Sequence, residues 1–289
     1  MLSPLGSFLC PPGYAGPRLG AIVREGSAMT EAARFVRRSA HDRVHRGERP
    51  HAVRTHELGL EPVVLVPGFL AGDGTLTLMS RHLRRLGYRT YRSTMHANVG
   101  CSQQAAEALE RRIEAIAAKR GRKVTIVGHS LGGLMARAVA ARRPDLVDGI
   151  ITLGSPLLAP GAASPLLLFD LALVIGLQRV GLGRMMGTDC TSGDCARLSW
   201  EQSRVRLPRG VSFTSVFSRR DGMIDWRSCL DPQAEAVEVT TSHLGMAFDP
   251  VVLDIVAEAL AANRSRREQR ENRVSRRARL AAVPDVSVG

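Results

Sequence analysis

The sequence predicts an α/β fold in which a mostly parallel sheet is flanked by helices. Short apolar segments of strand type alternate with helical segments from residue 61 onward. One of these strands, at 124–127, runs through a glycine-edged turn directly into a helical segment. Strands that alternate with helices are joined by right-handed crossovers, so we expect parallel strands with reactive groups at their carboxyl ends.

The expected elements follow one another in a regular order from Glu61. In chain order they are a strand at 62–66, a helix at 75–86, a strand at 88–93, a helical stripe at 106–116, the strand at 124–127 with the helix after its turn, strands at 149–154, 211–217 and 236–240, and a closing helix at 250–262. These segments lie in one domain that we place at 57–263.

The composition fits a globular protein. The chain has 289 residues, of which 44% are hydrophobic and 4% aromatic, so one α/β domain with insertions can bury a sizeable core. The formal net charge is +13, and much of it lies at 34–54 and 264–279, outside the expected core. Arginine far exceeds lysine, which we interpret as a compositional bias and not as a recognition device, so nucleic-acid binding is not expected. Peripheral contact of the basic ends with an anionic membrane is left open.

The two ends of the chain are expected to lie outside the domain. Residues 1 to about 30 are rich in proline and glycine and are expected to lack structure, so 1–56 is interpreted as a disordered or partly helical extension. A helix-like stretch begins at Met29, which is an alternative start to Met1. No basic start precedes a continuous apolar run, which favours a cytoplasmic location. Residues 264–289 form a basic tail, helical or disordered.

The turn after the strand at 124–127 carries the strongest functional signal. It reads Gly128-His129-Ser130-Leu131-Gly132, a G-x-S-x-G motif. The serine of such a turn sits on a bend so sharp that side chains two residues to either side would clash. A serine at a helix start can also be a simple N-cap, but a strand before it and a helix after it favour a nucleophile. Ser130 is the candidate nucleophile.

Acyl transfer by a serine requires a base and a carboxylate that orients the base. In this topology the expected chain order is serine, acid, histidine. His243 follows the last strand and is the histidine that lies beyond the acidic candidates. Asp221 directly follows a strand and is the preferred acid, while Asp225 and Asp231 are alternatives.

The negative charge that develops on the substrate requires an oxyanion hole made of backbone N–H groups. One donor is expected from Leu131, directly after the serine. The second is expected in the turn after the first strand, at Phe69 with Leu70 as its neighbour, because Pro67 has no N–H and Gly68 permits a tight bend.

Together these motifs resemble the α/β-hydrolase superfamily, and more narrowly its bacterial lipase and esterase branch. The matching segments are VVLVPGF at 63–69, GHSLGG at 128–133, LGSP at 153–156, SRRDGMIDW at 218–226 and SHLGM at 242–246. The resemblance implies Ser130 as nucleophile, Asp221 as acid, His243 as base, and neither cofactor nor metal. Many members carry His-Gly in the first turn, where this chain has Pro67-Gly68.

Residues 157–208 interrupt the regular alternation of strands and helices. They contain an apolar segment at 166–175, which is too short, and too polar at Asp170, for a membrane span. We interpret 157–208 as a helical cap over Ser130, with ordinary core or membrane-surface contact as alternatives. The apolar segment can line an acyl pocket together with Met185 and Met186.

The expected activity is a serine hydrolase acting on carboxylic esters, with a small-molecule or lipid ester as substrate. An acyltransferase could use the same site, with an alcohol in place of water. A non-catalytic binding or membrane-surface protein on a hydrolase scaffold is the alternative from another class.

The five cysteines are scattered and odd in number, so they do not form a disulfide framework. Cys190 and Cys195 bracket a short loop that could hold a local disulfide. A zinc site is not indicated there, because no second Cys/His pair lies nearby at zinc spacing.

Overall fold

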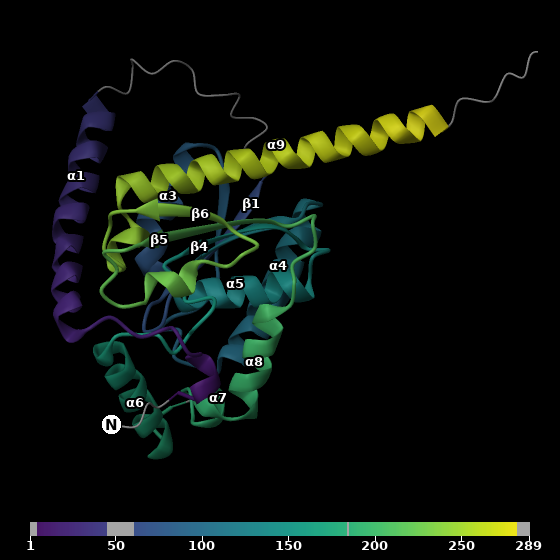
Figure 1. Cartoon of the computed structure of the whole chain (residues 1–289). Helices are drawn as coiled ribbons and strands as arrows, with labels where there is room; N and C mark the ends of the chain where they lie inside the picture. Colours follow the sequence, from purple (N-terminus) through teal and green to yellow (C-terminus); the bar gives the residue numbers. More distant parts are fainter. Residues whose placement is uncertain (1–4, 45–60, 184, 282–289) are drawn as a thin grey trace, which may run out of the picture.

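The computed structural model describes residues 5–44, 61–183 and 185–281, and a six-stranded sheet lies at their centre (Figure 1). Its strand order is β2-β1-β3-β4-β5-β6, and every neighbouring pair is parallel. The strands are β1 (Pro62–Val66), β2 (Arg89–Arg92), β3 (Val124–His129), β4 (Val147–Leu153), β5 (Ser212–Ser218) and β6 (Glu235–Val239). The parallel sheet expected from the sequence is confirmed.

Helices flank this sheet on both faces, and in chain order they are α3 (Thr77–Arg85), α4 (Ser102–Arg120), α5 (Leu131–Arg142) and α9 (Pro250–Ala281). The 3-10 helix η3 (Asp73–Leu76) leads into α3. Helices α3 and α9 pack on one face, and α4 and α5 pack on the other (Figure 1). The result is the three-layer α/β arrangement that the alternation of elements predicted.

Consecutive residues of the central strands pack into two different hydrophobic cores, one on each face of the sheet. Ile126 and Ile150 pair in register and pack against α4 and α5. Val127 and Ile151, the next residues along, pack against α3 and α9. All four are fully buried. A parallel strand that is covered on both faces needs apolar side chains at consecutive positions, which explains the largely apolar segments in the sequence.

Between β4 and β5 the chain leaves the sheet and forms the helices α6 (Pro165–Arg179), α7 (Asp189–Ser192) and α8 (Asp194–Arg204). They lie on the side of the molecule away from α9 (Figure 1). Helix α6 begins where the Ser164 hydroxyl accepts a hydrogen bond from the Leu167 N–H, with proline at the first helical position. None of the described helices combines the length and the apolar character needed to cross a membrane.

Helix α6 is apolar on two sides. Leu171, Val174 and Ile175 are buried and form an apolar cluster with Met186. Phe169 points the other way and is 63% exposed. The buried side contributes to the pocket beside Ser130 described below.

The N-terminal segment is ordered and docked on the domain. It forms η1 (Ser7–Leu9), η2 (Leu19–Ser27) and α1 (Ala28–Val44). Helix α1 contacts the start of α9 and the 3-10 helix η5 (Leu244–Ala247). The prediction that residues 1 to about 30 lack structure is therefore wrong over 5–30. A terminal segment becomes ordered when tertiary contacts tie it down, and those contacts leave no local pattern.

The closing helix is longer than expected. Helix α9 continues to Ala281, well beyond the predicted end at 262. Arg267, in the part interpreted as a basic tail, pairs with Glu61 and, at 2.9 Å, with Asp148. These ion pairs hold the extension against the edge of the sheet, so the structure shows no break at 263.

Candidate active site

Ser130 lies at the sharp junction of β3 and α5. Its backbone has φ 53° and ψ −122°, which is strained for a residue with a side chain. A Cβ at Gly132 would lie 2.3 Å from the carbonyl oxygen of Val66, and one at Gly128 would lie 2.5 Å from that of Gly132. Both glycines of the motif are therefore required by close backbone packing, as the G-x-S-x-G pattern predicted.

The candidate acid and base are in direct contact. His243 Nδ1 lies 2.7 Å from Asp221 Oδ2, and both side chains are buried. The other oxygen, Oδ1, accepts hydrogen bonds from the N–H groups of Met223 and Ile224, each at 2.8 Å. The two N–H groups hold the carboxylate in a fixed orientation, in which Oδ2 contacts the imidazole.

The three candidates share one edge of the sheet. Ser130, Asp221 and His243 follow β3, β5 and β6, so all three lie at the carboxyl edge of the parallel sheet. Gly154, after β4, has φ +54°, and a Cβ there would lie 2.9 Å from His243 Nδ1. A side chain at this position would collide with the imidazole. The glycine of the LGSP segment at 153–156 therefore leaves the space that His243 occupies.

The charge state of His243 is set by its surroundings. Burial lowers its pKa, but the charge of Asp221 and the hydrogen bond to it raise the pKa, and the charge of Glu25 adds to this. The net result is a pKa above the ordinary histidine value. The imidazolium form is therefore favoured next to the carboxylate.

His129, inside the motif, holds the loop that carries His243. Burial and the neighbouring His243 lower its pKa to about 3, so its ring is neutral. Its Nε2 lies 3.0 Å from the carbonyl oxygen of His243 and donates to it. The ring centroids of the two histidines are 4.8 Å apart. His129 thus supports the candidate base by hydrogen bonding and packing.

The turn after β1 packs against the nucleophile. A Cβ at Gly68 would lie 3.0 Å from Ser130 Cβ. The Pro67 carbonyl accepts a 2.8 Å hydrogen bond from the buried Asn98 amide, which fixes the turn from the other side. Within the described residues, the N–H groups of Phe69 and Leu131 donate to no protein group, and both residues line the pocket at Ser130. Both are free to bind an oxyanion.

The two alternative acids have other partners. Asp225 Oδ1 accepts from the Arg227 N–H at 3.1 Å at the start of the 3-10 helix η4 (Trp226–Cys229). Asp231 forms a buried ion pair with Arg137, with Nε and Oδ2 2.9 Å apart. Among the contacts of the described residues, the carboxylate bonded to His243 is that of Asp221.

A carboxylate from the N-terminal segment connects the two loops of the acid and the base. Glu25 Oε1 accepts from the N–H groups of Gly222, at 2.8 Å, and His243, at 3.0 Å. Glu25 Oε2 accepts from the Leu244 N–H at 3.0 Å. The side chain is buried. Sequence reasoning missed this residue, although Glu25 is the first acidic residue of the chain.

A second glutamate acts beside it. Glu31 Oε1 accepts from the Ser242 N–H at 2.9 Å, and Glu31 Oε2 accepts from the Ser242 hydroxyl at 2.6 Å. Ser242 directly precedes His243 in the chain. The N-terminal extension therefore provides two buried carboxylates that bind the backbone on either side of the candidate base.

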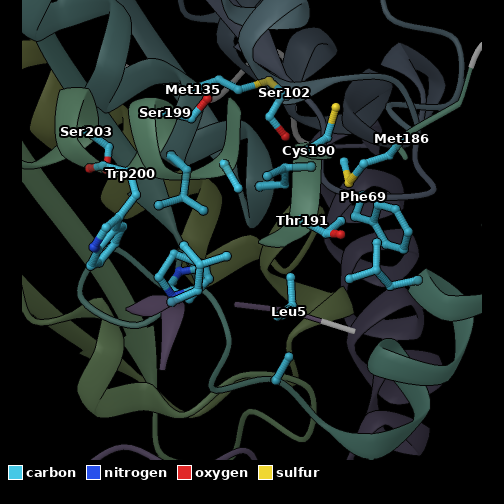
Figure 2. A pocket seen from close by; sticks show the side chains of 18 of the residues that line it. Leu5, Phe69, Ser102, Met135, Met186, Cys190, Thr191, Ser199, Trp200 and Ser203 are labelled. Carbon is cyan, nitrogen blue, oxygen red and sulfur yellow. The ribbon is translucent and has the colours of Figure 1, made fainter. Parts of the chain in front are cut away.

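An apolar pocket opens beside Ser130. Its wall comes from α4, α5, the helices between β4 and β5, and Leu5 of the N-terminal segment. Figure 2 shows Phe69 and Met186 toward one end and Trp200 with Ser203 toward the other. The cavity volume is about 160 Å³. A cavity of this size accepts one apolar group of about the volume of benzene.

Comparisons with known proteins agree with the observed fold. A family model described as the alpha/beta hydrolase fold matches residues 61–199, which include Ser130 but end before Asp221. A triacylglycerol lipase of Vibrio cholerae is 35% identical over 99 residues, which are 32% of this chain and 31% of that protein. The match thus spans about a third of the lipase's length.

Similar solved structures extend the likeness beyond the matched segment. The mature form of Bacillus licheniformis lipase BlEst2 has a TM-score of 0.55 and 15% identity, covering 69% of this chain and 91% of that one. The metagenome-derived lipolytic enzymes LipS and LipT give a TM-score of 0.50 and 16% identity, covering 71% of this chain and 93% of that one. At such identities these structures show a shared fold. The family model, the parallel sheet and the nucleophile turn together show that this chain has the α/β-hydrolase fold.

Proposed function

We propose that this protein is a serine hydrolase of the lipase and esterase type, which cleaves carboxylic esters through an acyl-enzyme intermediate. The observation that carries the proposal is the buried pair of His243 and Asp221, 2.7 Å apart, at the same sheet edge as the strained turn of Ser130. A serine on such a turn needs a base whose tautomer is fixed by a carboxylate, and this pair supplies it.

In this mechanism His243 takes the proton from the Ser130 hydroxyl as its oxygen attacks the ester carbonyl carbon. The N–H groups of Phe69 and Leu131 bind the oxyanion that forms. Collapse of the tetrahedral intermediate breaks the ester bond, and the leaving alcohol takes the proton from His243. Water then attacks the acyl-enzyme with His243 as base, the acid leaves, and Ser130 regains its proton. Asp221 orients the imidazole of His243 and stabilises its charged form.

The pocket supports an apolar acyl group of limited length. Its lining is mostly apolar, and its volume of about 160 Å³ suits a short to medium chain. We expect turnover of p-nitrophenyl esters to be highest for chains between butyrate and octanoate, and lower for acetate and palmitate. Rates that are equal for all chains, or highest with acetate, would contradict the proposed substrate class. An added alcohol that diverts the acyl group from water would favour the acyltransferase alternative.

A change at the far wall of the pocket tests where the acyl chain lies. Ala138 lines the pocket on α5, eight residues after Ser130, which is about 12 Å along the helix axis. We expect Ala138→Phe to reduce kcat/KM for octanoate by about tenfold or more, because one or two methylene groups in a pocket are worth about 1 to 3 kcal/mol. Acetate should be hydrolysed as in the wild type.

The matched control adds the same side chain on the outside of α6. Leu173 is 52% exposed, so Leu173→Phe should leave the preference for chain length unchanged. Thermal unfolding of both variants separates overpacking from occlusion of the pocket. An unchanged octanoate rate in a well-folded Ala138→Phe variant would show that the acyl group lies elsewhere.

The pKa of His243 gives the proposed mechanism a pH dependence. The base must be neutral to accept the serine proton, and its pKa is raised above the ordinary value of about 6.5. We therefore expect kcat/KM for an uncharged ester to fall as the pH drops through a pKa above that value. A pH series in buffers of constant ionic strength measures it, and a midpoint well below 6.5 would be inconsistent with this environment of His243.

A further inference from the structure

Three cysteines from different parts of the chain meet beside the pocket. Cys101 directly precedes α4, Cys190 belongs to α7, and Cys195 is the second residue of α8. Their sulfur atoms all lie within 4.8 Å of one another, and those of Cys101 and Cys195 are 3.3 Å apart. All three are free thiols and half-buried. No other group of potential metal ligands of this kind occurs in the described parts of the chain.

The separations, 3.3 Å for one pair and no more than 4.8 Å for any pair, bracket those of three ligands of one ion. With metal–sulfur bonds of about 2.3 Å, sulfur atoms around a zinc ion lie about 3.8 to 4.0 Å apart. A disulfide would bring two sulfurs to about 2.0 Å and leave the third thiol unused. Cys190 and Cys195 are separated by four residues, which matches the Cys-x2–4-Cys spacing of zinc sites. Cys101 joins them across 94 positions of sequence.

The start of α4 favours a thiolate at Cys101. Cys101 is the N-cap of α4, a helix of 19 residues, and the N-terminus of a helix stabilises a negatively charged sulfur. Because the three side chains are partly exposed, an ion can enter and solvent can occupy a further coordination position. We propose that Cys101, Cys190 and Cys195 bind one thiophilic ion, Zn²⁺, through three thiolates with solvent as the fourth ligand. Each thiol that ligates the ion gives its proton to solvent.

A bound ion would connect the core domain to the helices α7 and α8, which border the pocket. Cys190 itself lines the pocket, and Figure 2 shows it together with Ser102, the first residue of α4. An ion bound here fixes α7 and α8 to the start of α4. Binding of the ion does not depend on the proposed hydrolase activity, whereas any effect of the ion on hydrolysis rests on it.

The test is metal binding by the reduced full-length chain. After treatment with a chelator and removal of the reductant under anaerobic conditions, the protein is titrated with Zn²⁺ and with Cd²⁺. We expect one ion per chain and an ultraviolet charge-transfer band of the size given by three Cd–S bonds. Cys101→Ser should weaken Zn²⁺ binding by more than about tenfold, since loss of a ligand should exceed the effect of losing an outer-shell partner. Cys10→Ser, outside the cluster, should bind as the wild type does.

Several results would overturn the proposal. These are no stoichiometric binding by the reduced wild type, equal affinity of Cys101→Ser and wild type, or a disulfide within the cluster that forms in air even with Zn²⁺ present, seen by mass spectrometry of alkylated protein. Circular dichroism of metal-free Cys101→Ser and Cys190→Ser shows whether each variant is folded. Labelling of Ser130 by a fluorophosphonate is measured separately, so a failed metal site and a failed hydrolase assignment give different results.

Discussion

Replacement of Ser130 by alanine is expected to lower kcat for ester hydrolysis by about 10⁴ to 10⁶-fold. The hydroxyl oxygen is the atom that forms the acyl-enzyme, and without it only binding and the oxyanion hole remain. The turn itself should survive, because alanine keeps the Cβ and occupies the same strained backbone, with φ 53°. Steady-state kinetics and labelling by a fluorophosphonate probe measure the loss, and thermal unfolding should change little.

Ser155 supplies a matched control for this variant. It is a buried serine just after β4, and its hydroxyl donates to the Leu153 carbonyl at 3.4 Å. Ser155→Ala should retain both labelling and turnover. Undiminished labelling of Ser130→Ala would assign the nucleophile to another residue, and a well-folded wild type that is not labelled would favour a non-catalytic binding protein.

The sheet and the nucleophile turn could be predicted from sequence because both rest on local patterns. The consecutive apolar residues around Ile126 indicate a strand buried on both faces. The glycines around Ser130 are required because any side chain there would clash with backbone close by in the same turn and the strand beside it. The order of Asp221 and His243 after their strands then follows from the topology, in which strand ends share one edge of the sheet.

The polar supports of the site could not be predicted in this way. Glu25 lies 197 positions from Gly222, and Asn98 lies 31 positions from Pro67. Neither residue belongs to a periodic pattern. The role of each depends on contacts between loops that come together only in the folded chain. Cys101 could not be assigned to the cysteine cluster from sequence either, because it lies 94 positions from Cys195. Local composition at the N-terminus even indicated disorder, because it does not report the hydrogen bonds made on docking.

Glu25 is therefore the residue whose replacement should have the second largest effect. Glu25→Ala leaves two buried N–H groups, those of Gly222 and His243, and the partly buried N–H of Leu244 without acceptors. Each buried group costs about 1 to 3 kcal/mol when it loses its acceptor, so we expect at least about 2 kcal/mol less stability. Because the loops of Asp221 and His243 lose their common support, kcat should fall by up to about 100-fold, the size expected for a misplacement of about 1 Å. Denaturant unfolding and steady-state kinetics measure the two effects.

A positioning role can be separated from a merely structural one by the pH profile. The charge of Glu25 is one of the causes that raise the pKa of His243. Glu25→Gln removes the charge and keeps one acceptor, so the acid limb of kcat/KM should move to lower pH. Arg38→Ala is the matched control, because it removes an ion pair between α1 and Asp254 of α9 without touching the loops of Asp221 and His243. It should leave kcat and the pH profile unchanged.

Truncation extends the same argument to the start of the chain. A protein that begins at Met29 retains α1 from its second residue but lacks Glu25 and the pocket residue Leu5, and should lose at least as much activity as Glu25→Ala does. Glu31 remains in that protein and still binds Ser242, so the loop of His243 keeps one of its two carboxylate supports. Full activity of the truncated chain, with an unshifted pH profile, would mean that the loops of the acid and the base hold their geometry without Glu25.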